Sequence, residues 1–398
     1  MNRRETAVDL DAVVVGGGPA GATAAADLAA RGRRVLLLDR AGRIKPCGGA
    51  IPPRLIRDFE IPDHLIVGRA TSARMIAPSS RSVDMPVGDG FVGMVDRDVF
   101  DEWLRARAEA AGAERRTGTF DRIDRDPDGC AVVVYRTGRR GIEVRVRARS
   151  VIGADGARSG VARQTLKGAD QMPCVFAYHE VIRSPALSDA GFDRSRCDVI
   201  YQGRLSPDFY AWIFPHGDTA SIGVGSAHKG FALRNSVREL RAESGLSACQ
   251  TVRGEGAPIP LKPLRRWDNG RDVVVAGDAA GVVAPASGEG IYYAMVGGRC
   301  AAEAVEGLLA TGRPQALRLA RKRFMRAHGR VFWILGVMQY FWYRNDKRRE
   351  RFVRICEDKD VQALTWQAYM NKELVRAKPM AHARIFFKDL RHLVGSAA

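Results

Sequence analysis

The chain has 398 residues, of which 46% are hydrophobic and 27% charged. This composition is that of an ordinary folded protein and excludes disordered and collagen-like chains. The formal net charge of +18 favours an anionic partner, such as a lipid surface or a nucleic acid. Seven cysteines without any C-x-x-C pair predict free thiols in a reducing cytoplasm rather than a disulfide framework.

The first residues, MNRRETAVDLDAVVV, lead directly into an apolar run and contain no export signal. The longest apolar stretch, VFWILGVMQYFWY over 331–343, is shorter than the ~20 residues that span a bilayer. We therefore expect a cytoplasmic protein that does not cross a membrane.

The N-terminal part of the chain predicts a strand, a glycine turn and a helix. The run 10–15 is apolar and β-branched, GGGPAG follows at 16–21, and a helical pattern continues to Gly32. The turn supplies a G-x-G-x-x-G spacing, with the helix N-terminus placed to hold a pyrophosphate. The next apolar run, VLLLD, ends in Asp39, where an acidic residue binds ribose hydroxyls. The sequence therefore predicts a dinucleotide-binding unit.

Two later segments end strands in acidic residues. RVRARSVIGADGARS places Asp155 after an alternating run, and GRDVVVAGDAAG places Asp278 after a buried run. Beyond Asp278, a helix is predicted to open after GEGI at 288–291, where its free amides would stabilise negative charge. Only the G-x-G-x-x-G turn at 16–21 follows an apolar strand pattern and leads directly into a helical pattern, so a second nucleotide would have to bind without a Rossmann domain of its own.

These segments resemble the FAD-dependent reductases and hydroxylases of the glutathione-reductase type. The resemblance implies FAD as the cofactor, with Asp278 at the flavin ribitol chain. The segment 96–108 predicts an amphipathic helix with Asp96 as its N-cap. In the resembling enzymes an arginine at the start of this helix faces the cofactor, and Arg97 takes that place here. The expected cofactor-binding residues are Gly16, Gly18, Pro19, Ala20, Gly21, Asp39, Arg40, Gly48, Gly49, Arg97, Asp155, Gly277, Asp278, Gly288, Gly290 and Ile291.

Between residues 167 and 258 the pattern changes to short alternating runs that predict a second sheet. Within PDFYAWIFP, Tyr210, Trp212 and Phe214 share one face of a strand. Three aromatic side chains on one face form an apolar wall that suits a long hydrocarbon, although ordinary sheet core is the alternative.

The fold class expected from these patterns is α/β: an FAD-binding Rossmann domain with an inserted antiparallel β-sheet substrate domain and a helical C-terminal tail. The expected boundaries are 1–60, 90–165 and 256–312 for the FAD-binding domain, 61–89 and 166–255 for the substrate domain, and 313–398 for the basic helical region.

The stretch KPCGGAIPPRL over 45–55 places Cys47 in a loop after the ribose-binding strand. A neutral thiol suits an apolar site, so Cys47 is a candidate proton donor, and Gly48 and Gly49 allow close backbone approach to the flavin. The alternatives are a buried small side chain or a bystander, with Tyr210 or water as the donor. The seven histidines show no paired ligand spacing, so we expect no metal site.

The whole chain resembles the geranylgeranyl reductases, through P-x-x-Y-x-W-x-F-P and a C-x-G-G-like motif that has one residue fewer here. The strings RIKPCGGAIPPRLI, VIGADGARS and VAPASGEGIYYAMVGGR are most similar to the branch of (bacterio)chlorophyll biosynthesis. The resemblance implies NADPH-dependent reduction of the geranylgeranyl tail of the pigment to phytyl. The alternatives are reduction of free geranylgeranyl diphosphate or isoprenoid lipids, and monooxygenation on the same fold.

From Thr311 onward the chain carries 20 Lys and Arg residues against 7 Asp and Glu. This basic region surrounds the aromatic block at 331–343, which favours peripheral contact with an anionic inner-membrane surface. The alternative is that the rings belong to the core and the charges to a solvated face. No recognition motif accompanies the charge, so we expect no nucleic-acid partner.

Overall fold

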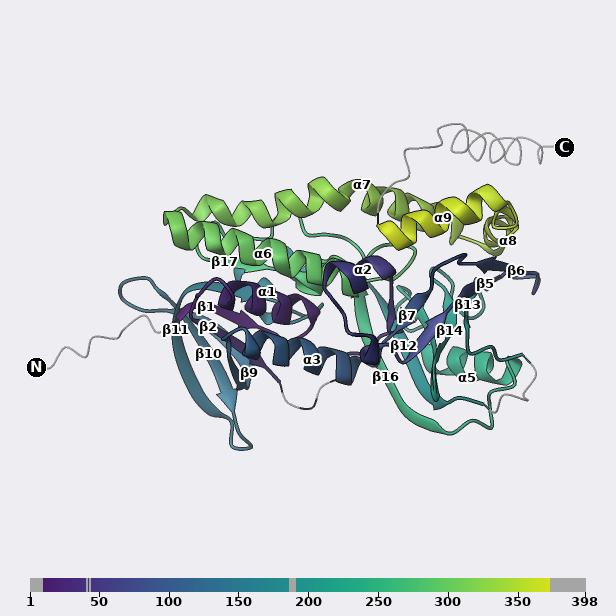
Figure 1. Cartoon of the computed structure of the whole chain (residues 1–398), viewed down its shortest axis with the longest axis horizontal. Helices are drawn as coiled ribbons and strands as arrows, with labels where there is room; N and C mark the ends of the chain where they lie inside the picture. Colours follow the sequence, from purple (N-terminus) through teal and green to yellow (C-terminus); the bar gives the residue numbers. More distant parts are fainter. Residues whose placement is uncertain (1–9, 41, 43, 186–190, 373–398) are drawn as a thin grey trace, which may run out of the picture.

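The computed structural model describes residues 10–40, 42, 44–185 and 191–372, and Figure 1 shows two sheet regions side by side with the C-terminal helices along one side of them. The helices are α1 (Pro19–Ala29), α2 (Pro53–Asp58), α3 (Arg97–Ala110), α4 (Gly160–Thr165), α5 (Leu233–Glu243), α6 (Ile291–Thr311), α7 (Arg318–Trp342), α8 (Asp346–Ile355) and α9 (Lys359–Asn371).

The strands fall into three sheets, the smallest of which pairs β3, β7 and β4. Their bounds are β1 (Leu10–Val15), β2 (Val35–Asp39), β3 (Ala50–Ile51), β4 (Gly68–Ala70), β5 (Ser72–Ile76), β6 (Ser82–Pro86), β7 (Val92–Met94), β8 (Glu114–Thr117), β9 (Thr119–Arg125), β10 (Ala131–Thr137), β11 (Ile142–Gly153), β12 (Cys174–Arg183), β13 (Arg196–Ile200), β14 (Ala211–His216), β15 (Thr219–Ser226), β16 (Thr251–Pro260) and β17 (Val273–Val275).

The first sheet has the order β8-β2-β1-β11-β10-β9, and β17 pairs with the end of β11. Strands β8, β2, β1, β11 and β17 run parallel, whereas β10 is antiparallel to both of its neighbours. Every residue of β1 is buried, as expected for a strand covered on both faces. The expected strand, turn and helix at the N-terminus are confirmed, and the fold is α/β with a Rossmann-like unit.

Small residues allow α1 to lie close to its neighbours. A Cβ atom on Gly21 would lie 1.8 Å from the carbonyl oxygen of Gly16, and one on Gly298 of α6 would lie 2.1 Å from that of Ala20. A side chain at either glycine would therefore push α1 away from the glycine turn or from α6.

The second sheet has the order β16-β12-β15-β14-β13-β5-β6. Its neighbouring strands are antiparallel except for β13 and β5, which are parallel, so the expected antiparallel sheet contains one parallel pair. This pair joins two strands that are far apart in the chain, and parallel neighbours require such a long crossover.

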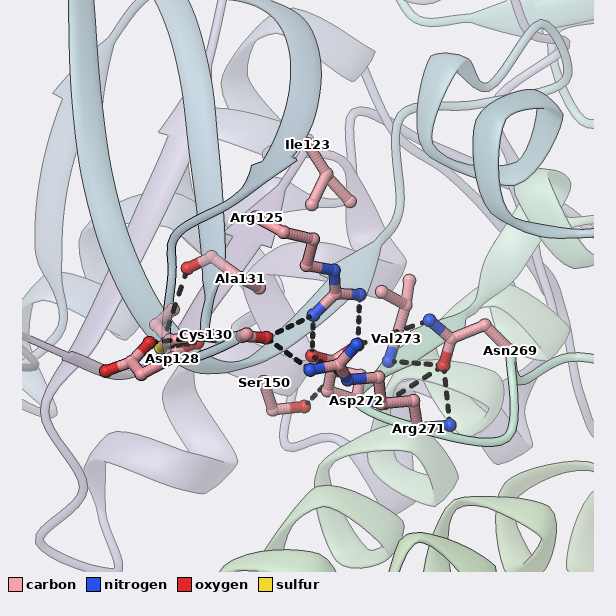
Figure 2. A network of polar contacts seen from close by, with 12 residues as sticks. Ile123, Arg125, Asp128, Cys130, Ala131, Ser150, Asn269, Arg271, Asp272 and Val273 are labelled. Carbon is pink, nitrogen blue, oxygen red and sulfur yellow. Dashed lines mark hydrogen bonds and ion pairs between the residues drawn. The ribbon is translucent and has the colours of Figure 1, made fainter.

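A polar network fixes the position of β17 against the first sheet, as Figure 2 shows. The guanidinium of Arg125 binds Asp272 at two points, one of them 2.7 Å long, and the hydroxyl of Ser150 donates to the backbone carbonyl of Asp272 at 2.9 Å. The side-chain oxygen of Asn269 accepts from the backbone N–H groups of 271–273 at 2.9 to 3.0 Å. The network thereby positions the glycine–aspartate turn that follows β17.

Candidate active site

A wide cavity of about 1000 Å³ lies beside the glycine turn, and the carboxyl ends of β1 and β2 contribute to its wall. Gly16, Gly17 and Gly18 line it, and Gly16 has a φ of +104°, a conformation that favours glycine. A Cβ atom on Gly18 would meet nothing within 4 Å. The turn therefore exposes its backbone to the cavity immediately before the N-terminus of α1, which starts at Pro19.

Asp39 and Arg40 also line the wide cavity, at the end of β2. The guanidinium of Arg105 lies 3.3 Å from the carboxylate of Asp39 and donates to the carbonyl of Gly17 at 3.3 Å. Arg105 also donates to the carboxylate of Glu102, three residues earlier in α3, at 2.9 Å. Sequence reasoning missed Arg105, although the polar face of the amphipathic helix was a signal for it.

Hydrogen bonds to Glu102 shift its ionisation. Arg115 is the main cause, and together with Arg105 it outweighs desolvation and lowers the pKa of Glu102 to about 2. Glu102 therefore remains ionised at neutral pH and keeps Arg105 in place beside Asp39.

Asp155 lines the wide cavity, but its carboxylate caps α4. It accepts hydrogen bonds from the hydroxyl of Ser159 at 2.5 Å and from the backbone N–H groups of Gly160 and Val161 at 2.7 and 3.3 Å. Burial raises the pKa of Asp155, against the lowering effect of these bonds. A role of Asp155 in cofactor binding stays a prediction, since the residue lines the wide cavity while its carboxylate is bonded to the start of α4.

The turn after β17 carries Gly277 and Asp278 into the same region. Gly277 has a φ of +64°, and a Cβ atom on it would lie 2.7 Å from that of Ala20. Asp278 is buried and forms an ion pair with Lys45. Sequence reasoning missed Lys45, because its partner is 233 residues away in the chain.

These features fit FAD. The glycine turn and the N-terminus of α1 would hold its phosphates, Asp39 its adenosine ribose, and Asp278 the flavin side. Gly290 and Ile291, at the start of α6, line a second cavity, and the free amides of this helix start suit negative charge.

A second, mostly apolar cavity of about 320 Å³ meets the wide cavity at a shared wall that includes Lys45, Ala177 and Asp278. Tyr210, Trp212 and Phe214 all line it, and successive rings are 6.0 and 6.3 Å apart between centroids. The structure thus brings the three predicted substrate residues together in one wall.

Hydrogen bonds fix two of these rings. The Tyr210 hydroxyl donates to the carbonyl of Ser287 at 2.7 Å, and burial raises the pKa of Tyr210. The Trp212 N–H donates to the Ser221 hydroxyl at 3.1 Å, which lies 2.9 Å from Nδ1 of the buried His179. Tyr210 is consequently a poor proton donor, because its proton is held by a carbonyl in an apolar environment.

The loop before α6 packs directly against this wall. Gly288 has a φ of +65°, and a Cβ atom on it would lie 2.9 Å from the Tyr210 hydroxyl. The neighbouring Glu289 forms a 2.6 Å ion pair with Lys372, and both side chains are 4% exposed. Burial lowers the pKa of Lys372, although Glu289 opposes the shift. This pair, which sequence reasoning missed, holds the end of α9 beside the apolar cavity that Tyr369 lines.

Cys47 lies on the apolar cavity, and its sulfur accepts a hydrogen bond. The backbone N–H of Gly49 donates to its Sγ at 3.4 Å, and the buried guanidinium of Arg97 interacts with it as well. Arg97 also binds Asp101 at 2.9 and 2.8 Å. Burial lowers the pKa of Arg97, but Asp101 and Cys47 outweigh it, so the pKa is raised.

The loop around Cys47 rests on His216. Its Nε2 atom lies 2.9 Å from the carbonyl oxygen of Gly48, and a Cβ atom on Gly49 would lie 2.4 Å from its Cε1 atom. Asp96 precedes α3 as expected, but its side chain makes no cap hydrogen bond. Its carboxylate instead lies 3.4 Å from Nδ1 of His216.

Comparison with known proteins first defines the class. Residues 14–61 match a family described as an NAD(P)-binding Rossmann-like domain. The solved structure of a geranylgeranyl bacteriochlorophyll reductase-like protein from Thermoplasma acidophilum is similar with a TM-score of 0.79 and 23% identity, covering 94% of this chain and 99% of that one. A flavin-dependent brominase is similar with a TM-score of 0.68 and 16% identity, covering 96% and 99%. The chain therefore has a Rossmann-like unit and shares the fold of these two proteins.

Sequence relatives then define the family. A geranylgeranyl diphosphate reductase of Rhodobacter capsulatus is 59% identical over 97% of both chains, and a chloroplastic one of Oryza sativa is 35% identical over 98% of this chain and 87% of that one. A digeranylgeranylglycerophospholipid reductase of Methanocaldococcus jannaschii is 30% identical over 74% and 76%. The chain belongs to the geranylgeranyl reductase family, which confirms the resemblance found in its motifs.

Proposed function

We propose that this protein reduces the isolated double bonds of a geranylgeranyl group, that of a (bacterio)chlorophyll tail in the first place, with NADPH as the electron source. The observation that carries the proposal is the shared wall at Lys45 and Asp278, where an apolar, aromatic-lined cavity meets the cavity that fits FAD. A long hydrocarbon in the apolar cavity would thereby be brought to the cofactor.

Reduction of each double bond requires a hydride at one carbon and a proton at the other. FAD, held by the glycine turn, Asp39 and Asp278, would supply the hydride when bound, and NADPH would be its source of electrons. Cys47 is the proposed proton donor, because its thiol lies on the apolar cavity. The Gly49 N–H and the Arg97 guanidinium would stabilise the thiolate that remains, and a proton from solvent would restore the thiol.

The walls of the apolar cavity suit a chain that must move between successive reductions. Besides the aromatic rings, the methionines Met75, Met85 and Met338 line it. Thioether side chains are flexible and adapt to irregular apolar partners, so they do not fix one register of a prenyl chain. The polar head group of the substrate, outside the cavity, would then make the polar contacts that hold the substrate on the protein.

Helix α7 supports peripheral contact with an anionic membrane. Its residues Trp333, Val337 and Tyr340 follow one another at helical spacing and are 70%, 48% and 73% exposed. Leu335 and Met338 of the same helix line the apolar cavity. Part of the aromatic block is therefore core, and the exposed part supports the proposed membrane contact. No helix in the described part of the chain is long and apolar enough to cross a membrane.

A basic hollow beside α7 adds charge to this surface. It is lined mainly by Arg265, Arg266, Arg318, Arg321, Lys322 and Arg326. Aromatic and basic side chains on one surface are the combination that interfacial helices use, so we expect binding to anionic but not to neutral vesicles.

The proposal is tested by anaerobic incubation of the holoenzyme and NADPH with geranylgeranylated bacteriochlorophyll, and separately with geranylgeranyl diphosphate, followed by mass analysis. Products heavier by two, four and six hydrogens from the pigment support the proposal. Products from the diphosphate alone would assign the free prenyl substrate instead. An absolute requirement for oxygen, with an added oxygen atom in the product, would indicate a monooxygenase.

A further inference from the structure

The wide cavity extends beyond the residues that fit FAD. Its outer part is formed by the second sheet and by the segment before α5, and it includes Phe176, Tyr178, Phe231 and Arg234. Phe176 and Tyr178 belong to β12, Phe231 lies just before α5, and Arg234 is in the first turn of α5, so none of them comes from the Rossmann-like unit. The inner part, with the glycine turn and Asp39, accounts for one dinucleotide, so the outer part has no assigned occupant.

Four arginines that line the cavity lack an acidic partner within the described residues: Arg40, at the end of β2 in the inner part, and Arg158, Arg163 and Arg234. By contrast, Arg105 in the inner part is paired with both Asp39 and Glu102. Arg163 donates only to the backbone carbonyls of Ser159 and Arg158, at 3.2 and 3.1 Å. Arginines left without carboxylates around a cavity provide the donors that phosphate groups require.

Aromatic surfaces lie among these arginines. Phe176 is 40% exposed, although it is a large hydrophobic residue on a strand. The guanidinium of Arg234 lies over the ring of Tyr178 at 5.3 Å. Glu255, the acidic residue that lines this part, is 3.1 Å from Arg253 and 3.5 Å from His179. An exposed ring beside unpaired arginines suits a flat heterocycle that carries phosphates.

We infer that this outer part of the cavity is the binding site of the 2′-phosphorylated nicotinamide dinucleotide, an inference that rests on the proposed function. Arg158, Arg163 and Arg234 would bind its phosphate groups, and Phe176 or Tyr178 would stack on one of its rings. The apolar cavity lies across the shared wall at Ala177 and Asp278. The electron donor and the prenyl chain therefore approach that wall from different cavities.

The site is tested by calorimetric binding of adenosine 2′,5′-bisphosphate to the holoenzyme, with 5′-ADP as the comparison ligand. Arg234→Ala should weaken binding of the 2′-phosphorylated ligand by roughly tenfold or more, as loss of a charge-assisted hydrogen bond does, and should reduce the preference for NADPH over NADH. The matched control is Arg139→Ala/Arg140→Ala in the turn between β10 and β11, where both residues are exposed. If both Arg234→Ala and Arg158→Ala/Arg234→Ala bind adenosine 2′,5′-bisphosphate with the wild-type affinity, the inference is overturned.

Two further measurements separate this site from the proposed function. The ratio of NADPH-driven to dithionite-driven prenyl reduction should fall about tenfold in Arg234→Ala, since dithionite does not need the site. If prenyl reduction fails with both donors in the wild type while the calorimetric effect is present, the proposed function fails and the nucleotide site stands. Inorganic pyrophosphate that binds through Arg234 more tightly than the bisphosphate would assign the arginines to a prenyl diphosphate and overturn the inference.

Discussion

Lys45 and Asp278 form an ion pair at the wall between the cavity that fits FAD and the apolar cavity. The side chain of Asp278 is 6% exposed and that of Lys45 is 36% exposed. The pair joins the loop of Cys47 to the turn after β17, so it connects the proposed proton donor to the cofactor side of the site.

Removal of this cation should weaken both the fold and the cofactor site. Lys45→Met leaves the buried Asp278 carboxylate without its partner, and we expect a loss of about 1 to 3 kcal/mol in the free energy of unfolding. FAD retention during gel filtration should fall as well, whereas Lys45→Arg should restore both. Lys229→Met, at an exposed position, is the control. Wild-type stability and FAD retention in Lys45→Met would show that the pair has no such role.

Substitution of Cys47 separates proton donation from hydride supply. Cys47→Ala should lower the single-turnover rate of prenyl reduction by about 10² to 10⁴, the range of general acid catalysis, while NADPH still reduces the flavin at close to the wild-type rate. Rapid mixing of pre-reduced enzyme with the prenyl substrate measures the first rate. Full single-turnover rates in both Cys47→Ala and Cys47→Ser would rule out the thiol as the donor.

Gly49 should tolerate no side chain. Gly49→Ala adds a Cβ atom 2.4 Å from the His216 ring and 2.5 Å from the carbonyl of Val95, at a φ of +69°. Gly88 has a φ of +82°, and a Cβ atom on it would meet nothing within 4 Å. Gly88→Ala should therefore lower the free energy of unfolding by about 1 kcal/mol through backbone strain alone. Gly49→Ala should cost about 1 to 3 kcal/mol more, because of overpacking. Urea unfolding measures both, and equal losses would contradict the packing of the Cys47 loop on His216.

The Glu102 carboxylate should make stability depend on pH. Hydrogen bonds from Arg115 and Arg105, the first of them larger, lower its pKa from 4.5 to about 2, despite opposing desolvation. A depressed pKa stabilises the folded state above pH 4.5, and this contribution is lost as the pH falls toward 2.

The comparison of wild type with Glu102→Gln tests that dependence. The difference in the free energy of unfolding should be present at pH 7 and should shrink between about pH 4.5 and 2. Glu109→Gln, on the same helix, is the control. A difference that is constant from pH 7 to pH 3 would mean that Glu102 does not hold its arginines through its charge.

The parts of the site that were predictable from sequence depend on local patterns. The glycine turn, the end of β2 at Asp39 and the aromatic face of β14 follow from spacing within a few residues. The ion pairs of Lys45 with Asp278 and of Arg105 with Asp39 join residues 233 and 66 positions apart, so only the folded chain brings them together.

Asp155 shows a second limit. Its motif predicts a cofactor-binding residue, and the structure places it on the wide cavity with its carboxylate accepting hydrogen bonds from Ser159 and Gly160 at the start of α4. Local capping competes with ligand binding for the same oxygen atoms, and spacing alone does not decide between them.

The most direct test of the account is an anaerobic rapid-mixing experiment with the NADPH-reduced holoenzyme and a geranylgeranylated pigment. The account predicts reoxidation of the flavin in step with the appearance of one saturated bond per flavin. A flavin that stays reduced in the presence of the pigment, and is reoxidised only when oxygen is admitted, would contradict it.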